Sequence, residues 1–173
     1  TATDTHGEVS EAVQVNFSIN ADEHAPTSPV ILEPEAGTEI IEQELDLVVG
    51  NATDEDNDSL NYYFELDKVP TFDSSDLIQS GAIPEQAEET IWHVSNLEDN
   101  CVYYWRVKAS DGSSESYWSY GSFRVNSRND NPLVPVVKNP GQNAWINTLS
   151  PALELHPGKD LDDDQLTYQI ELY

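Results

Sequence analysis

The chain has 173 residues, of which 33 are Asp or Glu and only 7 are Lys or Arg, so its formal net charge is −26. Nucleic acids and anionic lipid surfaces are bound through clustered cations, and this charge balance therefore excludes electrostatic binding to either. No apolar run reaches the ~18 residues that span a bilayer, and a single cysteine, Cys101, excludes an intramolecular disulfide.

The predicted elements are β-strands along the whole chain. Clusters of Gly, Pro, Asn, Asp and Ser form turns between segments rich in β-branched and aromatic residues, and these segments predict strands at 45–49, 60–66, 90–94, 102–109 and 121–126. The stretch 84–90 is the only weak helix candidate. About seven short strands in about 100 residues are typical of a β-sandwich, so the predicted fold class is all-β.

The sequence repeats itself after 106 residues. When residues 17–67 are laid on residues 123–173, 15 of the 51 aligned positions are identical. The repeat predicts a tandem array in which residues 1–22 end one unit, residues 23–128 form a complete unit and residues 129–173 begin the next. A unit of this length folds as an independent domain. Because the chain has no Met and no signal peptide, we expect it to be a piece of a larger protein.

Residues 97–109, Leu-Glu-Asp-Asn-Cys-Val-Tyr-Tyr-Trp-Arg-Val-Lys-Ala, resemble the turn and following strand of fibronectin type III domains, in which a Leu precedes a Tyr by six residues. The resemblance implies that the Tyr103 hydroxyl bonds back to the turn backbone and that alternate side chains from Tyr103 onward face the core. The family's usual B-strand Trp is absent, with Leu47 and Val49 in that segment, and Trp105 or Trp92 is expected to fill the space.

The resemblance covers the middle repeat and both partial ones. Residues 53–60, Thr-Asp-Glu-Asp-Asn-Asp-Ser-Leu, also resemble the acidic B–C loop of tandem fibronectin-like repeats in bacterial secreted and surface proteins. Residues 129–132, Asn-Asp-Asn-Pro, resemble the calcium-binding linker of cadherin repeats, which implies calcium at the junctions between units.

The acidic loop is the strongest metal-site candidate. Asp54, Asp56 and Asp58 alternate within a turn and supply hard oxygen ligands of the kind that Ca²⁺ binds in sets of six to eight. An EF-hand is excluded, because its Gly and its distal Glu are missing at the required spacing. The alternative interpretation is a solvated acidic turn, since Asp is common in turns.

Sandwich topology brings more acids to the same place. The B–C loop, the F–G loop and the entering linker share one end of such a domain, so Asp111 and either Asp22 or Glu23 are expected near the first aspartates. The same argument groups Asp130 with the second set. The predicted calcium ligands are Asp22, Asp54, Asp56, Asp58, Asp111, Asp130, Asp160, Asp162 and Asp164.

Other candidates are weaker. The four histidines lie in different elements without metal-ligand spacing, and no general base is near Cys101 in sequence. No nucleophile or phosphate-binding motif occurs, so the sequence predicts a protein that is not an enzyme. The aromatic residues Tyr117, Trp118 and Tyr120 flank the F–G loop, where exposed rings can stack on sugars.

The sequence thus predicts a structural or adhesive repeat segment of an extracellular or cell-surface stalk or filament, with Ca²⁺ stiffening the junctions between neighbouring repeats. The alternative is an accessory carbohydrate-binding module of a secreted enzyme, with a glycan on the aromatic patch. Because residues 1–22 and 129–173 are complementary parts of one repeat, head-to-tail association of copies is also expected.

Overall fold

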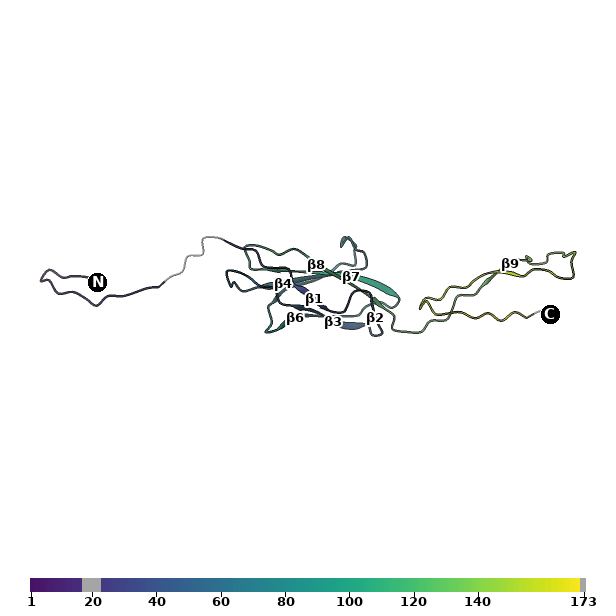
Figure 1. Ribbon diagram of the computed structural model, residues 1–173, viewed down its shortest axis with the longest axis horizontal. Helices are drawn as coiled ribbons and strands as arrows, with labels where there is room; N and C mark the ends of the chain where they lie inside the picture. Colours follow the sequence, from purple (N-terminus) through teal and green to yellow (C-terminus); the bar gives the residue numbers. More distant parts are fainter. Residues whose placement is uncertain (17–22, 172–173) are drawn as a thin grey trace.

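The computed structural model describes residues 1–16 and 23–171. These residues contain β-strands and no helix (Figure 1). The strands are β1 (Val30–Glu33), β2 (Thr38–Ile40), β3 (Glu44–Gly50), β4 (Asn61–Asp67), β5 (Ile78–Pro84), β6 (Glu89–Ser95), β7 (Cys101–Ser110), β8 (Ser119–Val125), β9 (Val136–Asn139) and β10 (Glu154–His156). No helix of the length and apolarity that a membrane span requires is found in the described ranges.

Eight strands form two sheets that pack face to face. The first sheet has the order β1-β3-β6, and the second has the order β2-β8-β7-β4-β5. All pairings are antiparallel except that of β2 with β8, which is parallel. The two packed sheets form a β-sandwich, and the predicted all-β fold class is confirmed.

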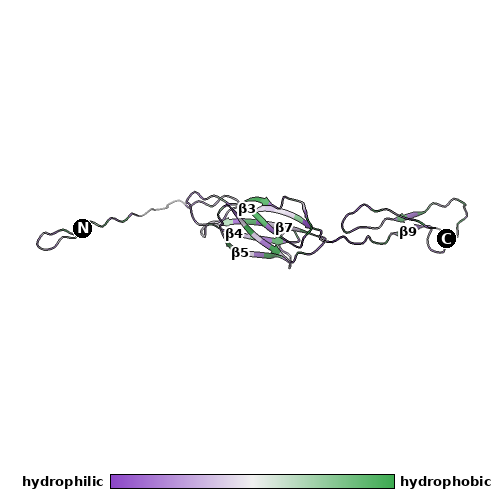
Figure 2. Cartoon of the chain, turned by 90° about the horizontal axis from the view of Figure 1, so that it is seen from below, coloured by the Kyte–Doolittle hydropathy of each residue, from purple (hydrophilic) through white to green (hydrophobic). Residues whose placement is uncertain are grey.

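The core lies between the two sheets, and buried side chains alternate with more exposed ones along β4 and β7. On β7, Tyr103, Trp105, Val107 and Ala109 are buried while the residues between them are partly exposed, as the alternation predicts. Figure 2 shows the apolar residues concentrated in these strands. Each fully buried large side chain contributes ~1.5–3 kcal/mol. The cluster is completed by Leu47, Val49, Leu60, Tyr62, Phe64, Leu66, Val94, Leu97, Phe123 and Val125.

Two details of the resemblance are present in the structure. The backbone N–H of Glu98 donates to the Tyr103 hydroxyl at 2.8 Å, which ties the turn to the start of β7 as the resemblance implies. Trp105 is fully buried and stacks on Phe64 with ring centroids 6.2 Å apart, so it supplies the core tryptophan. Its indole lies against Gly121, where an added Cβ would come within 2.4 Å of Nε1. Any larger residue at position 121 would therefore displace the tryptophan.

The helix candidate at 84–90 is wrong. Pro84 ends β5, which pairs with β4, and Glu89 already belongs to β6. The four residues between these strands form a turn in which the N–H of Glu85 donates to the carbonyl of Leu60. Pairing with a distant strand decided the conformation here, because local propensity is weak compared with a complete ladder of backbone hydrogen bonds.

The two ends of the chain carry smaller pieces of β-structure at opposite ends of the sandwich (Figure 1). Residues 1–10 form a hairpin closed by a bridge between Thr3 and Val9. At the other end, β9 and β10 pair with the register of β1 and β3 shifted by 106 residues, including the same irregularity. The C-terminal segment therefore begins as the complete sandwich does.

Candidate metal centre

The first acidic loop, residues 53–60, connects β3 to β4 and folds around Asp54. One carboxylate oxygen of Asp54 accepts hydrogen bonds from the N–H groups of Asp56 at 2.9 Å and Asp58 at 3.4 Å. Asn57 takes a left-handed backbone conformation, with φ 59°, which Asn tolerates better than most residues. The alternating aspartates thus produce a compact turn rather than a strand.

The entering linker reaches this loop. The N–H of His24 donates to an Asp56 carboxylate oxygen at 2.8 Å. Glu23, Asp56 and Asp58 each place a carboxylate oxygen within 4.8 Å of the others. The Asp56 side chain is only 8% exposed. Of the two acids that the sequence offers from this linker, Glu23 joins the loop, while Asp22 lies outside the described residues.

Two carboxylate oxygens near this end of the sandwich are buried and have no hydrogen-bond partner among the described residues. They are Oδ2 of Asp54 and Oδ2 of Asp111. Asp111 follows Ser110, which pairs with Asn61 at the end of the acidic loop. The hairpin between β7 and β8, called the F–G hairpin below, therefore adjoins that loop. The other Asp111 oxygen accepts from the N–H groups of Ser113 and Ser114. A buried anionic oxygen without a donor is costly, and a bound cation would remove that cost.

The second acidic loop, residues 159–166, repeats two of the hydrogen bonds that shape the first. Asp160 accepts from the N–H of Asp162 at 2.9 Å, as Asp54 does from Asp56. The N–H of Asp130 donates to Asp162 at 2.5 Å, where His24 donates to Asp56. The carboxylates of Asp160, Asp162 and Asp164 each place one oxygen within 4.8 Å of the others. Asp160 is 5% exposed, and Oδ1 of Asp162 is buried without a partner in the described part of the chain.

Asn100 also contacts this second group of acids, although it is not part of the repeated acidic loop. Asn100, in the turn before β7, donates through its amide to Asp130 at 2.6 Å. Its amide oxygen is buried and has no partner within residues 1–16 and 23–171. Amide oxygens are calcium ligands of the same class as carboxylates. Asn100 could not be found from the spacing of the aspartates, because it belongs to the preceding sandwich and reaches the loop only in the folded structure.

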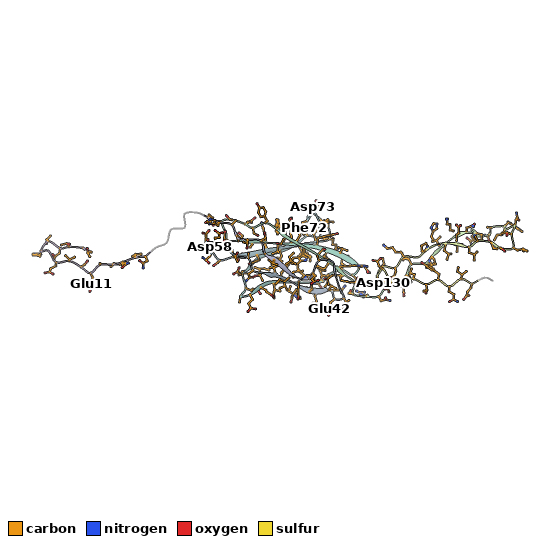
Figure 3. All side chains as sticks on the ribbon, in the orientation of Figure 1. Glu11, Glu42, Asp58, Phe72, Asp73 and Asp130 are labelled. Atoms are coloured by element: carbon orange, nitrogen blue, oxygen red, sulfur yellow. The ribbon has the colours of Figure 1, made fainter. Side chains whose placement is uncertain are left out.

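The two clusters lie at opposite ends of the sandwich, as the positions of Asp58 and Asp130 show (Figure 3). Three carboxylates within 4.8 Å repel one another unless protons or a cation offset their charge. Each cluster combines several hard oxygen atoms with irregular loop geometry, which is the donor set that Ca²⁺ prefers over Zn²⁺ or Mg²⁺.

The aromatic patch is partly covered by cations. The Arg106 guanidinium lies 4.3 Å from the ring centroids of both Trp118 and Phe72, and the Lys108 ammonium lies 4.9 Å from Trp118. Tyr117 and Tyr120 are 89% and 60% exposed. Trp118 is therefore stacked under protein side chains rather than presented as an open platform, and glycan binding stays a prediction.

Among the described residues, neither Cys101 nor any histidine belongs to a group of three or more side chains that could hold a metal ion. Burial raises the pKa of the Cys101 thiol, helped by the nearby Glu98 carboxylate, so the nucleophilic thiolate is disfavoured. His93 is exposed and contacts Asp46 at 2.8 Å across the first sheet.

Comparison with known proteins finds similarity among solved structures. No family model matches the chain, and no curated protein matches it. Among solved structures it is similar to the crystal structure of the chicken CNTN1 FN1–FN3 domains, with 12% sequence identity and a TM-score of 0.42. That similarity covers 66% of this chain and 39% of the other, so the chain spans well under half the length of that structure.

Proposed function

We propose that this chain is a structural segment of an extracellular or cell-surface protein, built from tandem β-sandwich units whose junctions are stiffened by Ca²⁺. The observation that carries the proposal is the set of buried carboxylate oxygens without partners, on Asp54, Asp111 and Asp162, at the two ends of one sandwich. Each lies in or beside an acidic loop that also contacts a linker, so one cation would fasten a unit to the chain that enters it.

The tandem organisation has support beyond the aligned residues. The N-terminal hairpin has the hydrogen bonds of the F–G hairpin: the N–H of Ala2 donates to Ser10, as that of Ala109 does to Ser116. Asp4 accepts from two N–H groups of its own turn, as Asp111 does. Residues 1–22, 23–128 and 129–173 are therefore proposed as the end of one unit, a complete unit and the start of the next.

The proposed location follows from calcium chemistry. Sites assembled from loops and a linker bind Ca²⁺ with dissociation constants of ~10⁻⁴–10⁻³ M, which extracellular calcium concentrations can fill. With a net charge of −26, the chain repels itself when no cation is bound. Filled sites would stiffen the chain, which suits a spacer or adhesive stalk.

Thermal unfolding tests the proposal, measured in millimolar Ca²⁺, in chelator, and in a monovalent salt of matched ionic strength. Binding to the folded state alone raises the free energy of unfolding by ~0.4–1.4 kcal/mol at 1 mM free Ca²⁺, for dissociation constants of ~10⁻³–10⁻⁴ M. The monovalent salt reproduces screening only, so it should give a smaller increase in melting temperature.

Variants separate a specific site from general screening. Asp56→Asn with Asp58→Asn should remove most of the response of the sandwich to Ca²⁺. Glu42→Gln with Glu88→Gln removes the same charge from exposed positions outside both clusters, and should leave the response intact. Equal melting temperatures in Ca²⁺ and chelator would show that the loops are solvated turns.

A further inference from the structure

The two junctions differ in charge at two equivalent positions whose side chains contact each other in the second junction. The left-handed residue of the first loop is Asn57, with φ 59°, and that of the second is Asp163, with φ 60°. The residue near the end of the preceding unit is Ser18 before the first junction and Arg124 before the second. Ser18 lies outside the described residues, so the comparison at that position is one of sequence. A neutral pair in one junction thus corresponds to an oppositely charged pair in the other.

Arg124 contacts the second acidic loop in two ways. It projects from β8, and its Nη1 lies 2.8 Å from a carboxylate oxygen of Asp163. Its Nη2 donates to the carbonyl of Leu161 at 2.5 Å. The planar guanidinium presents several donors in a fixed arrangement, so one side chain can hold a carboxylate and a backbone carbonyl together. The Arg124 side chain is 24% exposed and that of Asp163 is 70% exposed, so solvent screens the ion pair in part.

The turn before β7 holds the linker of the same junction. The Asp99 carboxylate accepts from the N–H of Ser127 at 2.7 Å and from its hydroxyl at 3.0 Å. Asn100 adds its hydrogen bond to Asp130. None of these contacts requires a bound cation.

We propose that the Arg124–Asp163 ion pair locks the second junction without calcium, whereas the sequence of the first junction has Ser18 and Asn57 at the equivalent positions and so has no such pair of charges. Arg124 on β8 thus binds the acidic loop of the following unit. The inference rests on the proposed tandem organisation but not on calcium binding. In an array built this way, a junction of the second kind stays ordered when calcium is removed.

The test is ¹⁵N NMR relaxation of the full chain in chelator, which compares the tumbling of residues 30–125 with that of residues 130–166. The wild-type protein should show coupled tumbling across the second junction. Asp163→Asn places the Asn of the first loop at this position and should lower the ratio of ordered to loosened junction about twofold to fivefold, as expected for a partly exposed ion pair. Arg124→Gln should do the same, and 1 M NaCl should weaken the wild-type coupling.

Two further variants keep the result specific. Arg124→Asp with Asp163→Arg restores the pair with reversed charges and should recover part of the coupling that either single change removes. Lys138→Gln removes an ion pair with Glu154, 3.2 Å long, that lies inside the C-terminal segment, and should leave the coupling unchanged. Uncoupled tumbling of the wild type in chelator, or an Asp163→Asn variant as ordered as the wild type, would overturn the lock. Failure of calcium to bind would overturn the proposed function and leave this result unaffected.

Discussion

The segments 30–66 and 136–171 have matching residues and matching strand register, but they differ in burial. Leu47 is fully buried, whereas its counterpart Leu153 is 42% exposed. Tyr62 is fully buried, and its counterpart Tyr168 is 44% exposed. Strands β6, β7 and β8 cover the first segment, and no second sheet covers β9 and β10 in the part of the chain that the structure describes. The same local pattern therefore forms strands in both places but a core in only one.

The largest expected difference between the segments comes from truncating one matched leucine. Leu47→Ala should lower the free energy of unfolding by ~2–5 kcal/mol, because it removes buried contacts and leaves a cavity. Leu153→Ala, at the equivalent position, should change it by less than ~0.5 kcal/mol. Urea unfolding followed by fluorescence of the buried Trp105 measures both. Similar losses in the two variants would mean that β10 also belongs to a packed core.

A matched pair of tyrosines gives a smaller contrast. The Tyr62 hydroxyl accepts from the N–H of Ala52 at 2.7 Å and donates to Glu85 at 3.0 Å. Tyr62→Phe leaves that buried N–H without a partner and should cost ~1–3 kcal/mol in urea unfolding. Tyr168→Phe should have no measurable effect, since the Tyr168 side chain is partly exposed. A neutral Tyr62→Phe variant would show that water replaces the lost hydroxyl.

The smallest expected effect is on the pH dependence of the free energy of unfolding, and it comes from Asp67, a carboxylate that only the complete sandwich has. Burial of Asp67 alone would raise its pKa, but hydrogen bonds from the Ser74 hydroxyl and from the N–H groups of Ser74, Lys68 and Val69 outweigh burial and lower the pKa. A lowered folded-state pKa stabilises the protein above the unfolded value of ~3.9, and that stability is lost as pH falls through the folded value.

The free energy of unfolding should therefore fall as the pH drops below ~4, and Asp67→Asn should flatten this dependence. The equivalent position in the following segment is Tyr173, so no matching carboxylate exists there. Urea unfolding between pH 3 and 6 measures the slope, with the exposed Asp73→Asn as the control. Parallel pH profiles for the wild type and Asp67→Asn would rule out this role for Asp67.

Much of the candidate site could be read from the sequence because its ligands are local. Asp54, Asp56 and Asp58 belong to one turn, and the repeat at Asp160, Asp162 and Asp164 marks them as a pair of loops. Asn100 and the Arg124–Asp163 pair could not be read in the same way. They reach the second loop from a different unit, through contacts between residues 30 to 39 positions apart in the chain. Head-to-tail association between copies stays a prediction.

The sequence by itself determined the all-β class, the inward face of β7, the role of Tyr103 and the positions of the acidic loops. Alternation along a strand and Asp-rich turns act over a few residues, so they are visible without the rest of the fold. Only the tertiary structure decided that residues 78–84 form a strand, that Trp118 lies beneath Arg106 and Lys108, and that Tyr62 is buried while Tyr168 is not. Those outcomes depend on which distant strands pack together, because burial and edge pairing are properties of the assembled sheets rather than of any single segment.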